Sequence, residues 1–401
     1  MQILVFNCGS SSQNYKFYRA EGTHLEVLCK GKAHRVGVKG SEPSFIEHTL
    51  GQETFRQTVP IPDHAHAAHL ILQFLAEKQQ HFDAIGHRFV HGGQLFTQSI
   101  RLTPEKYSQL EQILPLAPIH NPNSLSVIQV CREKFPDVPE TLTFDTAFHA
   151  NLPESAYRYA LPEALFKEDH IRKYGFHGLS YQYVSREAAR FLGKPLNSLK
   201  IIACHLGTGG SSVCAIASGI SIDTSMGYSP LAGLMMSTRS GDLDAGIVLD
   251  LLRQGKTPQD ISDSLNKKSG LLGISSFSSD IRDLLKAEAQ NDDPAAHLAI
   301  EMYTMRLRKM IGRYAALLGK FDALLFTDDI GLQNPVIRER TCHGLEWAGV
   351  QLDPQANQSA PLDRMSDIRQ KQANVHILVT PTDEESVIAS ETARLLEATH
   401  D

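Results

Sequence analysis

The chain lacks the features of membrane, secreted and nucleic-acid-binding proteins. No apolar run approaches the ~18 residues that span a bilayer. The start, Met1-Gln-Ile-Leu-Val-Phe-Asn7, has no charged segment or cleavage site of a signal peptide. There is no Lys/Arg-rich run, and 45 acidic against 39 basic residues give a formal charge of −6, which disfavours nucleic acid and anionic membranes as partners. We therefore expect a cytoplasmic protein.

Disulfides and simple metal motifs are also missing. The 6 cysteines show no CxxC spacing, which is typical of reduced thiols in the cytosol. The 18 histidines contain no HExxH pattern. His64, His66 and His69 lie in a segment that resembles an amphipathic helix, so surface or packing roles are favoured for them.

The chain does have the size and composition of a large globular protein. Its 401 residues are 42% hydrophobic and 21% charged, which predicts about two domains with sizeable cores.

One pattern occurs twice, about half a chain apart. An apolar strand, a Gly/Ser turn and a second strand occur over residues 3–18 and again over residues 201–217. Glycines allow positive φ in such a turn, and its backbone N–H groups and hydroxyls can converge on a phosphate. One copy alone would be an ordinary hairpin, but two copies predict a duplicated domain with a cleft between the halves.

Strands and helices alternate along the rest of the chain, which predicts an α/β protein. The residues from Thr382 to Glu385 match a capping box for a helix that runs towards Leu396. We expect loops over residues 50–63 and 352–369. The other predicted elements are strands at 84–90, 141–144 and 376–379, and helices at 65–77, 184–192 and 295–318.

Residues 228–244 are the most informative segment, because they place Arg239 among Ser, Thr, Gly and two aspartates after a proline. A rigid loop of this kind can present a guanidinium to an anion. The alternative is a buried ion-pair loop.

Four other short segments add polar groups at strand ends and in stiff turns. Taken singly, each of these groups fits a structural role. Together with Arg239 they match the requirements of phosphoryl transfer to an anionic acceptor. The groups are His120, Asp145, His177 and Arg88, the last of which shares a strand face with Val90.

Nearly the whole chain resembles the acetate kinase family. The resemblance is highly specific because many motifs match in order. They include Asn7-Cys-Gly-Ser-Ser-Ser12, His87-Arg-Phe-Val-His-Gly-Gly93, Ala117-Pro-Ile-His-Asn-Pro122, Phe144-Asp-Thr-Ala-Phe-His149, Tyr174-Gly-Phe-His-Gly178, Thr238-Arg-Ser-Gly-Asp242 and Pro381-Thr-Asp-Glu-Glu385.

The resemblance implies an α/β fold of two duplicated actin/sugar-kinase-like (ribonuclease H-like) domains around a central nucleotide cleft. The expected domains are residues 1–149, on the acyl side and joined by the C-terminal helix 384–401, and residues 150–383, on the nucleotide side. The family's function would be reversible transfer of a phosphoryl group from ATP to acetate or propionate. Expected partners are Mg²⁺ or Mn²⁺, ATP/ADP, a small acyl acid and a second copy of the chain.

The resemblance also implies roles for individual residues. Arg88, Asp145, His177 and Arg239 would be catalytic, and Asn7 and Glu384 would hold the metal. The acyl group would meet Val90, Ile119, His120, Phe176 and Pro230. The nucleotide would meet Ser12, His205, Gly207, Thr208, Gly209, Asp280, Ile281, Arg282, Asp329, Ile330 and Gly331.

The chain departs from the family pattern in its nucleotide half. Asn14 replaces a phosphate-directed lysine, with Lys16 two residues further on. Thr208 stands where Asn is usual, and Asp329 replaces a glycine whose backbone approaches the nucleotide. Leu332-Gln333 replace Glu-Asn. A carboxylate at 329 predicts steric conflict with, and repulsion of, a polyphosphate.

Two alternatives therefore remain open. The same acyl kinase could use pyrophosphate, phosphate or another nucleotide as donor, or the chain could be a weakly active paralogue that binds acyl phosphate. The sequence does not decide between acetate, propionate and butyrate.

Overall fold

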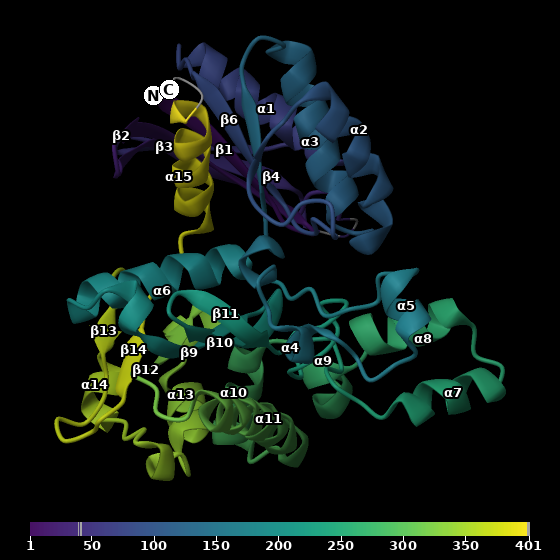
Figure 1. The fold of residues 1–401 in the computed structure, drawn as a ribbon, viewed down its shortest axis with the longest axis vertical. Coiled ribbons are helices and arrows are strands. Elements are labelled where there is room, and N and C mark those ends of the chain that lie inside the picture. The colour runs from purple at the N-terminus through teal and green to yellow at the C-terminus, as the bar shows by residue number, and fades with distance from the viewer. Residues whose placement is uncertain (39, 41, 399–401) are drawn as a thin grey trace. The chain divides into compact units, whose positions relative to one another are not determined.

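The structure is a computed structural model, which describes residues 1–38, 40 and 42–398. The chain forms two compact units (Figure 1). One consists of residues 1–150 together with the segment that begins at Asp383, and the other of Asn151–Thr382.

The first unit is built on one mixed sheet in the order β5-β4-β3-β2-β1-β6-β8-β7. Strand β1 pairs antiparallel with β2 and parallel with β6, and β6 is parallel to β8. The strands are β1 Gln2–Cys8, β2 Ser12–Glu21, β3 His24–His34, β4 Phe45–Leu50, β5 Glu53–Thr58, β6 Ala84–Phe89, β7 Ile100–Arg101 and β8 Glu140–Phe144. The helices are α1 His64–Glu77, α2 Pro104–Gln112, α3 Asn121–Lys134 and α15 Glu384–Glu397.

Helices cover both faces of this sheet, which explains why β1 is almost uniformly apolar. Leu4 and Phe6 share a core with residues of α1 and α3. Helix α15 packs on the other face, where a Cβ on Gly86 would lie 2.8 Å from the Ile388 side chain. A glycine in β6 therefore permits the close approach of α15.

The second unit is built on the sheet β11-β10-β9-β12-β14-β13. Its core lies between this sheet and the long helix α11, and it includes Ile202, Leu324 and Leu307. The strands are β9 Lys200–Gly207, β10 Gly210–Ala217, β11 Ile220–Thr224, β12 Ala323–Thr327, β13 Ser366–Asp367 and β14 His376–Val379. The helices are α4 Glu154–Tyr157, α5 Glu163–Lys167, α6 Gly178–Leu192, α7 Ala245–Arg253, α8 Pro258–Lys267, α9 Gly270–Ser275, α10 Ile281–Asn291, α11 Pro294–Leu318, α12 Asp328–Gln333, α13 Pro335–Cys342 and α14 Pro354–Gln358.

The two sheets repeat one topology. Strand β9 pairs antiparallel with β10 and parallel with β12, and β12 is parallel to β14, as β1, β2, β6 and β8 are arranged in the first unit. The Gly/Ser turn joins β1 to β2 and β9 to β10. The duplication predicted from the two hairpins is confirmed.

Most predicted elements are present, but three expectations were wrong. Residues 50–63 contain strand β5, and residues 352–369 contain α14 and β13, where loops were expected. The N-cap of α15 is Asp383, whose carboxylate accepts a hydrogen bond from the Ser386 N–H at 3.0 Å, and not Thr382.

Candidate active site

In the first unit, a buried ion pair joins two strand ends. Arg88 lies near the end of β6, and Asp145 directly follows β8. The guanidinium donates two hydrogen bonds to the Asp145 carboxylate, Nε to Oδ1 at 2.7 Å and Nη2 to Oδ2 at 2.5 Å. Burial opposes the charge of Arg88, but the carboxylates of Asp145 and Glu384 outweigh burial and raise the Arg88 pKa. The carboxyl ends of neighbouring parallel strands thus hold one fixed cation.

Asn7, at the end of β1, connects Arg88 to the start of α15. Its Oδ1 accepts a hydrogen bond from Arg88 Nη1 at 3.0 Å. Its Nδ2 donates to Glu385 Oε1 at 2.9 Å and to Glu384 Oε2 at 3.2 Å. The structure thus brings Asn7, Arg88, Asp145 and Glu384 into one network.

Three residues without an assigned role complete this network. Lys16 of β2 lies 2.8 Å from Asp383 and 3.4 Å from Glu385, measured from its ammonium to their carboxylate oxygens. Burial lowers the Lys16 pKa, but Glu385 and Asp383 outweigh it, so the pKa is raised. The sequence motif that contains Asp383 and Glu385 indicated a helix cap there and no role for either residue in binding or catalysis.

The network carries a formal charge of −2, because four carboxylates face two cationic side chains. Carboxylate and amide oxygens at the ends of β1 and β8 and the start of α15 are the ligand types that Mg²⁺ prefers. The residues present therefore fit a divalent cation. The carboxylates are Asp145, Asp383, Glu384 and Glu385, and the cations are Lys16 and Arg88.

The predicted acyl residues of the first unit differ in exposure. Val90 follows β6 directly and is buried, whereas Ile119 is 58% exposed. His120 occupies the N-cap position of α3, where Pro122 lies in the first turn. Ser12, predicted to meet the nucleotide, also lies in this unit, and its carbonyl accepts a hydrogen bond from the Gly9 N–H at 2.8 Å.

In the second unit, the His177 and His205 rings pack against each other beside the β9–β10 turn, with centroids 4.1 Å apart and planes tilted by 31°. His177 Nδ1 lies 2.8 Å from Ser212 Oγ, and His205 Nδ1 lies 2.9 Å from Ser180 Oγ. His177 has φ +60°, a left-handed conformation that is uncommon for residues other than glycine and concentrates at functional sites. Its neighbour Phe176 is buried.

Arg239 reaches the same turn from the loop between β11 and α7. A Cβ on Gly210 would lie 3.3 Å from Arg239 Nη1 and 3.5 Å from the His177 ring, so both side chains pack against the turn. The guanidinium donates to the Pro230 carbonyl at 3.2 Å. Within the described residues no carboxylate pairs with it, which contradicts the ion-pair alternative for this loop. Burial lowers the Arg239 pKa.

The altered loop at the end of β12 folds onto this turn. Asp329 accepts hydrogen bonds from the Thr208 N–H, at 2.8 Å, and from the Thr208 hydroxyl. Asp328 Oδ2 lies 3.0 Å from His205 Nε2. A Cβ on Gly207 would lie 2.0 Å from that carboxylate oxygen, so any larger residue there would displace the Asp328 side chain.

The remaining residues predicted to meet the nucleotide lie at the start of α10, within α12 and in the β9–β10 turn. Asp280 is the N-cap of α10 and accepts from the Arg282 N–H at 2.8 Å, while the Arg282 guanidinium also pairs with the Asp280 carboxylate. Ile281 and Ile330 are buried in the core of this unit. Gly209 lies in open space, whereas a Cβ on Gly331 would lie 3.6 Å from the Leu206 side chain.

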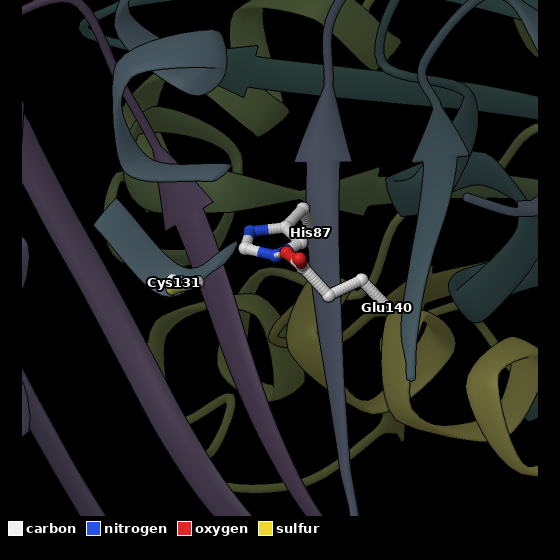
Figure 2. Close-up of side chains that lie close together, drawn as sticks. All are labelled: His87, Cys131 and Glu140. Atoms are coloured by element: carbon white, nitrogen blue, oxygen red, sulfur yellow. Dashed lines mark hydrogen bonds and ion pairs between the residues drawn. The ribbon is translucent and has the colours of Figure 1, made fainter. Parts of the chain in front are cut away.

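A second polar cluster, outside these networks, consists of His87, Cys131 and Glu140 (Figure 2). These side chains offer ligand atoms within 4.8 Å of one another and are all buried. However, His87 Nε2 already lies 2.6 Å from Glu140 Oε2. His87 Nδ1 has no hydrogen-bond partner in the described part of the chain, whereas metal-binding imidazoles normally use their second nitrogen. We interpret the cluster as a structural hydrogen bond beside a thiol.

The repeated sheet and the glycine turns define a duplicated α/β protein of the actin/sugar-kinase type. Comparison with known proteins gives the family. Residues 2–390 match the model of the acetokinase family. The chain is 45% identical to the acetate kinase of Caldicellulosiruptor saccharolyticus, with 99% of this chain and 100% of the relative covered. It is 43% identical to that of Thermotoga maritima, with 99% of each covered.

Solved structures agree with this result. The acetate kinase of Porphyromonas gingivalis matches with a TM-score of 0.88 at 38% identity, over 98% of this chain and 99% of that one. A propionate kinase of Francisella tularensis matches with a TM-score of 0.90 at 35% identity, over 98% and 99%. The chain belongs to the acetokinase family and is a kinase. No helix among the described residues is long and apolar enough to cross a bilayer.

Proposed function

We propose that the protein transfers a phosphoryl group reversibly between ATP and acetate, giving acetyl phosphate and ADP, with Mg²⁺ or Mn²⁺. One observation carries the proposal: Arg239 places a guanidinium without a carboxylate partner, among the described residues, beside the Gly210 turn and His177. A desolvated cation of this kind stabilises negative charge on a transferring group. Sequence relatives named acetate kinase favour this reaction over the two alternatives.

The acceptor needs little chemical activation. A carboxylate is already a nucleophile, so positioning and charge neutralisation are the main requirements for in-line transfer. Arg88 and Arg239 would hold the acyl carboxylate and the phosphoryl group, and His177 would donate to a phosphoryl oxygen. Asp145 fixes the Arg88 guanidinium at two points, which restricts its orientation.

Asn7 and Glu384 would hold the metal ion, with Asp145 nearby. The formal charge of −2 in this network supports a divalent cation. When bound, the ion would neutralise phosphate charge. Glu384 then serves as a ligand, and Asn7 orients it through the hydrogen bond between them.

We propose that Val90, Ile119, Phe176 and Pro230 receive the acyl methyl group and that His120 supports them. The side chains of Val90 and Phe176 are apolar and buried, which suits contact with a short alkyl chain. The name of the propionate kinase matched above makes propionate a second acid to test.

The nucleotide would lie near Ser12, His205, Gly207, Thr208, Gly209, Asp280, Ile281, Arg282, Asp329, Ile330 and Gly331. Because the Ile281 and Ile330 side chains are buried in the core, contacts there would use backbone groups.

We also propose a homodimer in the cytoplasm. Helix α7 exposes Ile247, Leu249 and Leu252, and none of its residues is buried. A second copy of the chain would cover such an apolar helix. All 6 cysteines are free and buried, which suits a reducing compartment.

A donor comparison tests the proposed reaction. Acetyl phosphate formation would be measured by hydroxamate trapping with ATP, GTP or pyrophosphate as donor, each with and without Mg²⁺. We expect Mg²⁺-dependent formation with ATP. Formation with pyrophosphate alone would establish the alternative donor, and no formation with any donor would overturn the proposal.

A further inference from the structure

A basic depression lies on the first unit, on the face of the sheet formed by β2, β3 and β4. Its volume is about 270 Å³, and its lining includes three lysines, two glutamates and two neutral polar side chains: Lys16, Lys30, Lys32, Glu47, Glu385, Asn14 and Thr49. This volume suits a small ion better than a nucleotide.

The strand register concentrates positive charge there. Lys16 of β2 is paired in register with Lys30 of β3, and Asn14 with Lys32. Because side chains two apart share a face, all three lysines face the same side. Like charges directly opposite each other in a sheet are destabilising. Asp383 and Glu385 offset the charge of Lys16, and Glu47 lies opposite Lys32 in register, so an anion would relieve repulsion mainly at Lys30.

The nearby carboxylates are already engaged. Glu47 pairs with Arg56 at 3.4 Å and lies 3.7 Å from His34. Glu385 accepts from Asn7 and pairs with Lys16. In the part of the chain that the structure describes, no acidic group forms an ion pair with Lys30 or Lys32, although Glu47 lies opposite Lys32 in register. Both lysines are exposed, so their ammonium groups are available to an anion.

We propose that this depression binds a small multivalent anion of the phosphate class. Lys30 and Lys32 offer two ammonium groups that form no ion pair among the described residues, and two such groups match a dianion better than a monocarboxylate. The Asn14 amide and the Thr49 hydroxyl line the same depression and add neutral donors. Inorganic phosphate and pyrophosphate both have the required size and charge.

Lys16 connects the depression to the candidate metal network. The same ammonium lines the depression and pairs with Asp383 and Glu385, on either side of Glu384 in sequence. An anion that draws Lys16 away leaves these carboxylates less neutralised. Occupancy should therefore strengthen Mg²⁺ binding, and by linkage Mg²⁺ should strengthen anion binding. This coupling, unlike the anion site, rests on the proposed function.

Calorimetric titration of the full chain with pyrophosphate tests the site. It is performed without divalent metal, which would bind pyrophosphate, and with acetate and a non-hydrolysable ATP analogue at saturation. The double variant Lys30→Gln/Lys32→Gln is compared with Lys134→Gln, an exposed lysine on α3 of the same unit. We expect binding by the native chain and Lys134→Gln, and at least about tenfold weaker binding by the double variant, as for the loss of one charge-assisted hydrogen bond or more.

Equal affinity in the double variant and the native chain would overturn the site, as would no binding by the native chain. A thermal melt of each variant checks that the fold is retained. Because the readout is binding and not turnover, a failed donor comparison would leave this result interpretable. The coupling is tested separately, with the Mg²⁺ half-saturation expressed as free Mg²⁺ after correction for the ion that pyrophosphate chelates. A site that binds pyrophosphate without lowering this value in the native chain would overturn the coupling alone.

Discussion

The carboxylate of Asp329 accepts hydrogen bonds from both the backbone N–H and the hydroxyl of Thr208. Thr208 and Asp329 are two of the residues at which the chain departs from the pattern of its family. The two substitutions thus form one interaction that closes the β9–β10 turn. The Asp329 carboxylate accepts from the Thr208 N–H, which would otherwise be available to donate to a phosphate.

We expect Asp329→Asn to lower the KM for ATP and to leave the KM for acetate nearly unchanged. The amide oxygen can still accept from the Thr208 N–H, while the negative charge that repels polyphosphate is removed. At surface-like screening the change should be on the order of tenfold or less. Steady-state kinetics with ATP and acetate varied in turn measure it, and Asp363→Asn, an exposed aspartate of the same unit, is the control.

The quadruple variant Asp328→Ala, Asp329→Gly, Leu332→Glu and Gln333→Asn restores the family residues and should lower the KM for ATP further. If the native chain already binds ATP tightly and neither variant binds it better, the loop has been rebuilt around the nucleotide. Our interpretation of Asp329 as an obstacle would then be wrong.

Glu384→Ala should raise the Mg²⁺ concentration needed for half-maximal activity by about tenfold or more, because it removes a carboxylate ligand from the proposed metal site. Glu397→Ala removes an exposed carboxylate from the same helix and is the matched control. A Mg²⁺ titration of each variant checks the prediction. An unchanged curve in Glu384→Ala would indicate that this residue only favours the helix dipole, an effect under about 1 kcal/mol.

Local patterns predicted much of this fold, because strands and turns depend on neighbouring residues. The two glycine turns were found in this way. Strand β5 was missed because it is the edge strand, nearly all of its residues are exposed, and it is therefore polar. Sequence periodicity has no signal for such a strand.

Interactions between distant residues could not be predicted. Lys16 and Asp383 are 367 positions apart, and only the folded chain brings them together. Two further long-range contacts explain the wrong capping box: the Glu385 side chain bonds to Asn7 and Lys16 instead of to its own helix end. Which site residues act in catalysis stays a prediction, because residue types and positions do not measure activity.

We expect Leu249→Glu in α7 to convert the proposed homodimer into a monomer. A charge in a buried apolar interface is costly without a partner. Light scattering coupled to gel filtration measures the mass of each form. Leu362→Glu introduces the same charge at another exposed leucine of this unit and should not change the mass. A native chain that is already monomeric would contradict the proposal.

The protein should lose stability in mild acid partly through His48. Burial lowers the pKa of this imidazole from 6.5 to about 4, and it packs between the Tyr15 hydroxyl and the Phe74 ring. The unfolded chain takes up a proton below pH 6.5 that the folded chain resists. The contribution of neutral His48 to the free energy of unfolding is therefore complete above pH 6.5. It is lost as pH falls towards 4, by about 2 kcal/mol after allowance for solvent screening.

Urea unfolding at pH 7 and pH 5 measures this loss. His48→Leu should show a smaller decrease in the free energy of unfolding between the two pH values than the native chain. His69→Leu, at an exposed histidine of α1 in the same unit, is the comparison. An equal decrease in His48→Leu and the native chain would show that other groups cause the acid sensitivity.

Arg88 and Arg239 should respond differently to removal, although both are proposed to act on charge in the transition state. Arg239→Ala should lower kcat by about two orders of magnitude or more and leave the melting temperature nearly unchanged. No carboxylate depends on Arg239 in the described part of the chain. Arg88→Ala should lower kcat similarly but also destabilise the fold, by about 3–5 kcal/mol, because it leaves the buried Asp145 unpaired. Kinetics and thermal melts on the same samples separate the two effects.

The double variant Arg88→Ala/Asp145→Ala should recover stability without recovering activity, since it removes the unpaired charge but not the need for a cation. A recovery of both, or a loss of stability in Arg239→Ala equal to its loss of activity, would mean that these arginines serve the fold and not the reaction.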